Sequence, residues 1–110
     1  MALTREFRAT VWEKAQSSAA FRRALLSEAV ESLLGGDLET SKAILRDSIK
    51  ATIGYRALTD ATGIPEKSLI RMFGPSGNPR AAHLARVIEA LQRHEGVRLK
   101  VRAARRVDAD

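Results

Sequence analysis

The stretch YRALTDATGIPEKSLIRMFG, residues 55–74, decides the predicted fold. Residues 55–62 read as a short helix. Gly63 follows where the chain must turn sharply, and glycine adopts the positive φ of such a turn without steric cost. Pro65 suits the first position of a second helix, because its missing N–H and fixed φ do no harm there. The stretch therefore predicts two short helices joined by a tight turn.

The apolar residues of this stretch are spaced so that the two helices share one core. Leu58 lies in the first helix and Ile64 packs under the turn, while Leu69, Met72 and Phe73 fall at i, i+3 and i+4 of the second. Such spacing is typical of a helix-turn-helix, whose second helix enters the major groove of DNA. An ordinary helical hairpin in a small bundle is the alternative that the spacing leaves open.

The outer side of the predicted second helix carries groups that can recognise DNA. Lys67 and Arg71 lie four residues apart and share a face; arginine is the best reader of guanine, and lysine suits guanine or phosphate. Ser68 can reach a base or a phosphate. Glu66 can accept a hydrogen bond from cytosine or simply favour the helix dipole. For all four residues, the alternative to a DNA contact is a solvated side chain on the surface.

The charge of the chain is concentrated in its second half. The 110 residues carry a formal net charge of +6. Residues 1–54 hold 8 Lys and Arg against 7 Asp and Glu, whereas residues 55–110 hold 11 against 6. A basic half favours a polyanionic partner such as double-stranded DNA. Part of the excess is equally well explained as a solvated tail: Arg98, Lys100, Arg102, Arg105 and Arg106.

Composition argues against several other classes of protein. Cysteine is absent, so no disulfide or thiolate zinc site is possible, and a cytoplasmic location is permitted. Arg5, Glu6 and Arg8 interrupt the N-terminal residues, so we expect neither a signal peptide nor a membrane span. His83 and His94 have no neighbouring ligands at metal spacing. We expect no metal, no cofactor and no enzymatic activity, since no catalytic arrangement is recognisable.

Four further helices are predicted from apolar residues that repeat every three to four positions. They cover residues 4–16, 19–34, 38–51 and 79–94. Ser18 and Asp37 suit the N-caps of the second and third, and Asn78 that of the fourth. Gly96 is a suitable C-terminal stop. The predicted fold class is therefore all-α.

Trp12 stands beside the apolar stripe of the first helix, which is Leu3, Phe7, Val11 and Ala15. Tryptophan usually packs, so we expect a core or interface anchor. A sharper hypothesis is that Trp12 helps to bind a protein partner, since tryptophan is enriched at interface hot spots.

The spacing of the apolar residues changes after Gly96. Val97, Leu99 and Val101 alternate with charged residues, which is the pattern of a strand. A lone strand leaves its backbone groups unpaired, and pairing with the same strand of a second copy is the simplest remedy. We therefore predict a two-fold homodimer joined by an antiparallel ribbon through these three residues. The alternative is an extended tail lying on its own chain.

The predicted organisation has three parts. Residues 1–36 form a nearly neutral N-terminal helical arm. Residues 37–102 form the helix-turn-helix DNA-binding domain together with the short C-terminal strand. Residues 103–110, AARRVDAD, form a mobile tail.

Residues 33–101, about two-thirds of the chain, resemble the addiction-module antidote proteins, HigA-like antitoxins of the lambda-repressor-like helix-turn-helix class. The residues that carry the resemblance are LLGGD (33–37), LTDATGIPEKSLIRMF (58–73), GPSGNP (74–79) and IEALQRHEGVRLKV (88–101). Two features depart from the family. Residues 1–32 are longer than the arm of the antidotes, and Pro65 stands where a polar residue is usual.

The resemblance implies a lambda-repressor-like bundle that binds its own operator, represses its operon and neutralises a partner toxin. It also implies that Lys67, Ser68 and Arg71 occupy recognition-helix positions and that the segment around Asn78 approaches the DNA backbone. The alternatives are a stand-alone repressor without a toxin and a helical protein-interaction module.

Two arginines outside the second helix complete the predicted site. Arg56 lies near the start of the preceding helix, where helix N-termini also favour phosphate, and Arg80 follows the predicted cap. The expected DNA-binding set is Arg56, Glu66, Lys67, Ser68, Arg71, Asn78 and Arg80.

Overall fold

The computed structural model describes residues 5–107, which form six helices and no strand. The helices are α1 (Arg5–Ser17), α2 (Ala19–Leu34), α3 (Leu38–Ala51), α4 (Tyr55–Thr62), α5 (Glu66–Met72) and α6 (Ala81–Glu95). The predicted helical class is thus confirmed. Residue 4, the predicted start of the first helix, and Leu3 lie outside the described residues, as do residues 108–110 of the predicted tail.

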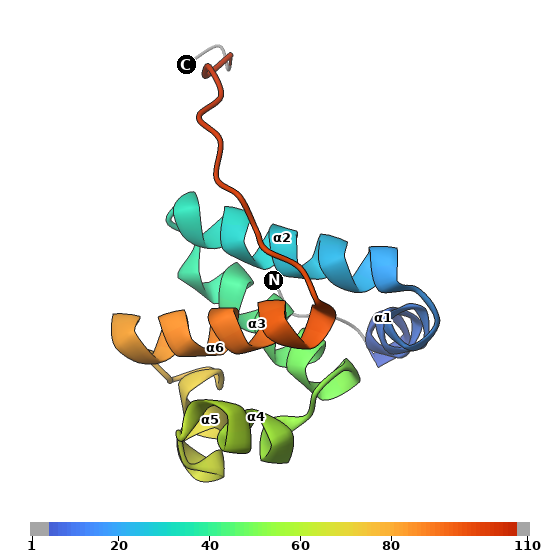
Figure 1. Ribbon diagram of the computed structural model, residues 1–110, viewed down its shortest axis with the longest axis vertical. Coiled ribbons are helices and arrows are strands. Elements are labelled where there is room, and N and C mark those ends of the chain that lie inside the picture. Colours follow the sequence, from blue (N-terminus) through green and yellow to red (C-terminus); the bar gives the residue numbers. More distant parts are fainter. Residues whose placement is uncertain (1–4, 108–110) are drawn as a thin grey trace.

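The helices are arranged around α3. α2 and α6 run across the middle of the molecule, and α1 packs on both α2 and α3 (Figure 1). α4 and α5 lie together at one end of the long axis, while the C-terminal segment leaves at the other end (Figure 1). The site predicted on α5 and the extended C-terminal segment therefore lie at opposite ends of the molecule.

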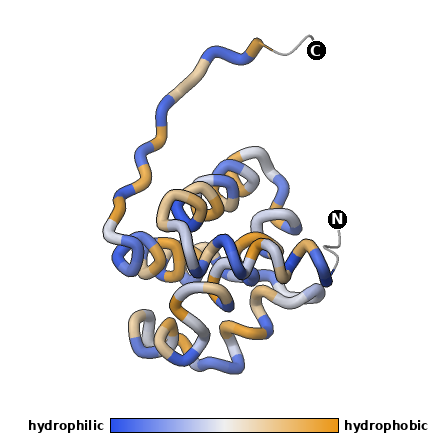
Figure 2. Tube along the Cα trace, turned by 90° about the vertical axis from the view of Figure 1, so that its right-hand side faces the viewer, coloured by the Kyte–Doolittle hydropathy of each residue, from blue (hydrophilic) through white to orange (hydrophobic). Residues whose placement is uncertain are grey.

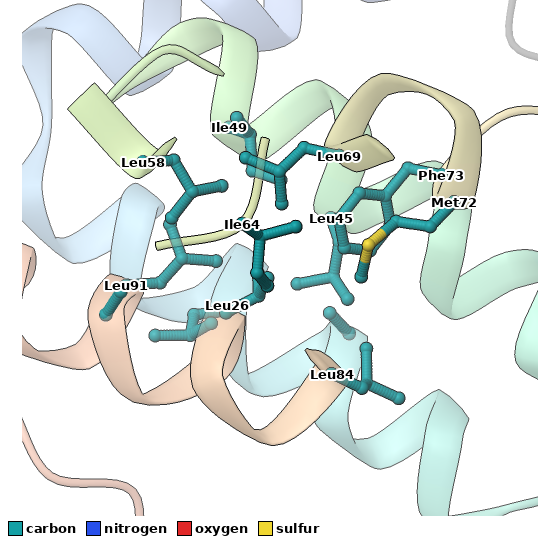
Figure 3. Packing of buried hydrophobic residues seen from close by; sticks show 13 residues of the cluster. Leu26, Leu45, Ile49, Leu58, Ile64, Leu69, Met72, Phe73, Leu84 and Leu91 are labelled. Carbon is teal, nitrogen blue, oxygen red and sulfur yellow. The ribbon is translucent and has the colours of Figure 1, made fainter. Parts of the chain in front are cut away.

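One hydrophobic core contains residues from each of the helices α2, α3, α4, α5 and α6 (Figure 3). Its largest almost fully buried members are Leu26, Leu45, Ile49, Leu58, Ile64, Leu69, Phe73 and Leu91, each at most 2% exposed. The predicted burial of the apolar residues around the α4–α5 turn is confirmed. α2 belongs to this core through Leu26 and Ala29, and the Ser41 hydroxyl of α3 donates a 2.7 Å hydrogen bond to the Ala29 carbonyl inside it.

The predicted helix ends are largely confirmed. The Ser18 hydroxyl accepts a 3.1 Å hydrogen bond from the Phe21 N–H, and the Asp37 carboxylate accepts one of 3.1 Å from the Thr40 N–H. Gly63 (φ 76°) and Gly96 (φ 67°) end α4 and α6 in the left-handed conformation that favours glycine.

Two predicted helix starts are wrong. Pro65 has ψ 144°, which is extended, so it occupies the N-cap position and α5 begins at Glu66. α6 begins at Ala81 and not at residue 79, and Arg80, not Asn78, is the N-cap. We attribute the later start of α6 to Gly77, which packs against the end of α5 so closely that a Cβ there would lie 2.1 Å from the Arg71 carbonyl oxygen. The chain needs the next residues to clear α5 before it can turn into α6.

Residues 97–107 are extended and form no regular secondary structure within the chain. The Gln92 side-chain oxygen accepts a 2.8 Å hydrogen bond from the Leu99 N–H, and Val97 and Leu99 pack against the core, while Val101 is 77% exposed. The alternation of apolar and polar residues along this segment is visible in Figure 2. A strand needs a second strand to pair with, and the single chain offers none among its described residues. Pairing between two copies therefore stays a prediction.

Candidate nucleic-acid interface

The seven predicted DNA-binding residues lie on the surface of α4, α5 and the loop that leads to α6. Six of them are exposed and Ser68 is half-buried. Their side chains are therefore accessible in the described chain, which is the first requirement for contact with a nucleic acid.

Four of the seven come together around an open hollow of about 320 Å³ between α5, the loop and the start of α6. Ser68 and Arg71 line it from α5, and Asn78 and Arg80 line it from the other side. Ser76 and His83 complete its polar lining. The hollow thus gathers hydroxyl, amide, imidazole and guanidinium groups, all of which can donate hydrogen bonds to an anion.

The electrostatics of the hollow favour negative charge. Two arginines line it and no aspartate or glutamate does. It also lies beside the N-terminal end of α6, whose first N–H groups donate no hydrogen bond to a capping side chain. Unpaired N–H groups and the helix dipole both attract anions at such an end. A phosphate group fits this chemistry.

The other three predicted residues lie outside the hollow. Arg56 is in the first turn of α4. Glu66 and Lys67 begin α5, and Lys67 shares a face with Arg71 because the two are four residues apart. α5 therefore presents a cationic face next to the hollow, with one carboxylate at its N-terminal end.

Lys42 supports the loop beside the hollow, and the sequence did not reveal this role. It is on α3 and only 2% exposed. Its Nζ donates hydrogen bonds to the carbonyls of Gly74 (3.1 Å) and Gly77 (2.7 Å). A signal was present in the sequence, because Lys42 stands in the same helical stripe as Leu38, Leu45 and Ile49. A lysine at such a position must find partners inside the protein.

Arg46, one turn after Lys42, reaches the same region. Its Nη1 donates a 3.2 Å hydrogen bond to the Phe73 carbonyl at the end of α5. Burial raises the pKa of the neighbouring Tyr55 phenol, an effect to which the Asp47 carboxylate adds and which the Arg46 charge opposes. Tyr55 therefore stays neutral at physiological pH and can act at the start of α4 only as an uncharged group.

Comparison of the chain with protein-family models, curated proteins and solved structures finds no significant match in any of the three.

A second surface lies between α1, α2 and α3. It is a mainly apolar hollow of about 480 Å³, with Phe7 and Val11 on α1, Phe21 and Leu25 on α2, and Ile44 on α3 among its lining. The Trp12 side chain is 52% exposed, so the expectation that it packs into the core is not met within the single chain. Its use as an anchor for a partner stays a prediction.

No group of His, Asp and Glu that could hold a metal ion occurs among residues 5–107. In the same range, none of the helices combines the length and the apolar character that crossing a membrane requires.

Proposed function

We propose that this protein is a sequence-specific DNA-binding transcriptional regulator, in which α4, the Gly63 turn and α5 form a helix-turn-helix of the lambda-repressor-like kind. The observation that carries the proposal is the hollow beside α5, which is lined by Arg71, Arg80 and neutral hydrogen-bond donors and by no carboxylate. Such a lining suits the DNA backbone, and the exposed face of α5 beside it suits the major groove.

The residues divide by role in this proposal. Lys67, in the first turn of α5, and Arg71, in its last turn, approach base edges from the face that they share, with Arg71 bidentate to guanine. Ser68, Asn78 and Arg80 hold a phosphate in the hollow, and Arg56 contacts a second phosphate. Phosphate contacts fix the register of the protein on the duplex, and base contacts give the sequence preference.

A homodimer on a two-fold operator fits the C-terminal segment. The backbone of residues 100–107 makes no hydrogen bond within the described chain, and Val101 is exposed. Pairing with a second copy along Val97, Leu99 and Val101 would satisfy the groups from residue 100 onward, whereas the N–H groups of Val97 and Leu99 already donate to Gln92. The operator half-sites would then lie roughly 34 Å apart, or a multiple of that spacing.

The sharper form of the proposal is an antitoxin and autorepressor of a type II toxin–antitoxin module in the cytoplasm. The apolar hollow between α1, α2 and α3 supports it, because it offers a protein partner such as a toxin a surface apart from α5. The same hollow favours the second candidate function, a protein-interaction module whose basic half is incidental. A stand-alone repressor would use α5 alone.

DNA binding is tested by fluorescence anisotropy with the DNA upstream of the gene. Arg71→Ala is expected to weaken specific binding by about 1–3 kcal/mol. Arg86→Ala is the matched control, because Arg86 is an exposed arginine of α6 outside the hollow. Equal affinities of the two variants would remove Arg71 from the site. Binding that does not weaken as salt rises would argue against phosphate contacts and for the interaction module.

The partner is tested separately. A small toxin-like reading frame beside the gene should encode a protein that copurifies with this chain. Ala24→Glu places a charge in the lining of the apolar hollow and should abolish copurification, whereas Ala20→Glu, at an exposed position one turn earlier on α2, should not. Copurification that survives both substitutions would exclude this hollow as the binding surface.

A further inference from the structure

We infer that Lys42, assisted by Arg46, is a positioning residue that holds the loop after α5 in the place from which Asn78 and Arg80 reach DNA. The two side chains come from α3, two helices earlier in the chain, and neither contacts the hollow itself.

Three oxygen atoms surround the Lys42 ammonium. The group donates hydrogen bonds to the Gly74 carbonyl at 3.1 Å and the Gly77 carbonyl at 2.7 Å, and it forms an ion pair with Glu39 Oε2 at 3.3 Å. Two of these acceptors belong to the loop. A buried ammonium is strongly disfavoured unless it is fully paired. The loop therefore cannot move away from Lys42 without leaving a buried charge unsatisfied.

The acceptors are backbone carbonyls at the C-cap of α5 and in the loop beyond it. Arg46 donates to the carbonyl of Phe73, the C-cap residue, and Lys42 donates to the carbonyls of Gly74 and Gly77 in the loop. The negative end of the α5 dipole also favours cations at this end of the helix. Two cations of α3 thus fix both the end of α5 and the course of the loop behind it.

The consequence for DNA follows from the sequence order. Asn78 comes directly after Gly77, and Arg80 two residues later, so the position of the Gly77 carbonyl sets where both side chains project. The hollow is lined by residues of both α5 and the loop, which stands against α5 in this structure. Only the statement that Asn78 and Arg80 reach DNA from this position rests on the proposed function.

The test compares Lys42→Met with Lys50→Met in the full chain. Methionine keeps the buried aliphatic stem and removes the ammonium. Lys50 is an exposed lysine on the same helix, so its variant loses the same charge without touching the loop. Amide exchange followed by NMR reports the loop through the Gly77 N–H, which donates to the Gly74 carbonyl at 3.1 Å. The Leu84 N–H, which donates to the Arg80 carbonyl in α6, is the internal reference.

The Lys42→Met variant should exchange at Gly77 at least tenfold faster relative to Leu84, and Lys50→Met should leave the ratio unchanged. An unchanged ratio in Lys42→Met, or a rise shared by Leu84, would mean that Lys42 serves general stability only, and would overturn the inference. If Lys42→Met does not fold, Arg46→Met replaces it, because Arg46 is partly exposed. The Gly74 N–H should then show the rise, and its absence would be equally decisive.

A DNA-binding measurement uses the same variants at a temperature where all of them are folded. Lys42→Met should bind operator at least tenfold more weakly. The slope of log affinity against log salt should fall by about 1, because the phosphate in the hollow is no longer neutralised by Arg80 of the displaced loop. A loosened loop with an unchanged slope would overturn the positioning role. If the wild-type chain binds no DNA, the proposed function fails, and the exchange ratio still decides whether Lys42 holds the loop.

Discussion

The substitution Gly77→Ala tests the packing of the loop against α5. Gly77 does not have a positive φ, so the conformation itself would accept alanine. The obstacle is space, because the new Cβ would lie 2.1 Å from the Arg71 carbonyl oxygen and 2.6 Å from that of Met72. Close contacts between an sp³ carbon and a carbonyl oxygen, such as the Cα–H···O contacts of sheets, begin at about 3.3 Å. The loop must therefore shift by roughly 1 Å or more.

The expected loss of stability follows from that shift. Overpacking of this kind costs about 1–3 kcal/mol. Movement of the loop also stretches the 2.7 Å hydrogen bond from Lys42 to the Gly77 carbonyl, and weakening a bond to a charged group adds to the loss. We therefore expect Gly77→Ala to lower the free energy of unfolding by about 2 kcal/mol or more.

Urea unfolding of the full chain measures the effect as a lower midpoint at unchanged slope. Gly74→Ala is the matched control in the same loop, because its Cβ would lie 3.3 Å from the Arg71 carbonyl oxygen, where a small adjustment is enough. Its stability should stay within about 1 kcal/mol of wild type, since alanine also lowers the entropy of the unfolded chain. A Gly77→Ala variant as stable as Gly74→Ala would refute the reasoning.

Three more predictions concern the core, a helix cap and the dimer. Leu69→Ala should destabilise the protein by about 2–5 kcal/mol in urea unfolding, because Leu69 is fully buried, whereas the half-exposed Ile70→Ala on the same helix should lose far less. The pKa of Asp37 is lowered, first by the hydrogen bond from the Thr40 hydroxyl, so the Asp37 cap stabilises the fold above the ordinary pKa of 3.8 and this stabilisation is lost as pH falls through the folded pKa. The difference in melting temperature between wild type and Asp37→Ala should therefore shrink in acid. A difference that does not change with pH would contradict this. Val101→Asp should give a monomer in analytical ultracentrifugation without lowering the monomer's stability, because Val101 is exposed; an unchanged mass would exclude a dimer joined there.

The local structure was largely predictable because it depends on neighbours in sequence. Ser18 and Asp37 cap helices within three residues of themselves, and Gly63 and Gly96 end them through their own conformation. The apolar stripes around the α4–α5 turn are equally local. Each of these features could be read from a window of a few residues.

The missed features depend on residues far apart in sequence. Lys42 binds carbonyls 32 and 35 residues away, and carbonyl groups leave no trace in the identity of the residue that bears them. The start of α6 was misplaced for a related reason: Asn78-Pro79 is a good local signal for a helix start, yet the contact of Gly77 with α5 takes precedence. Of the predicted site, the surface position of each residue could be foreseen, but not which four share one hollow.

The hydrogen bond from Ser41 to the Ala29 carbonyl, deep between α2 and α3, limits how the protein can be dissected. A fragment that starts at residue 37 would expose to water the apolar side of α3 on which Leu26 and Ala29 pack. Truncated chains would therefore confuse loss of a binding surface with loss of the folded state. Assigning separate tasks to the two ends of this molecule requires single-residue exchanges in the intact polypeptide.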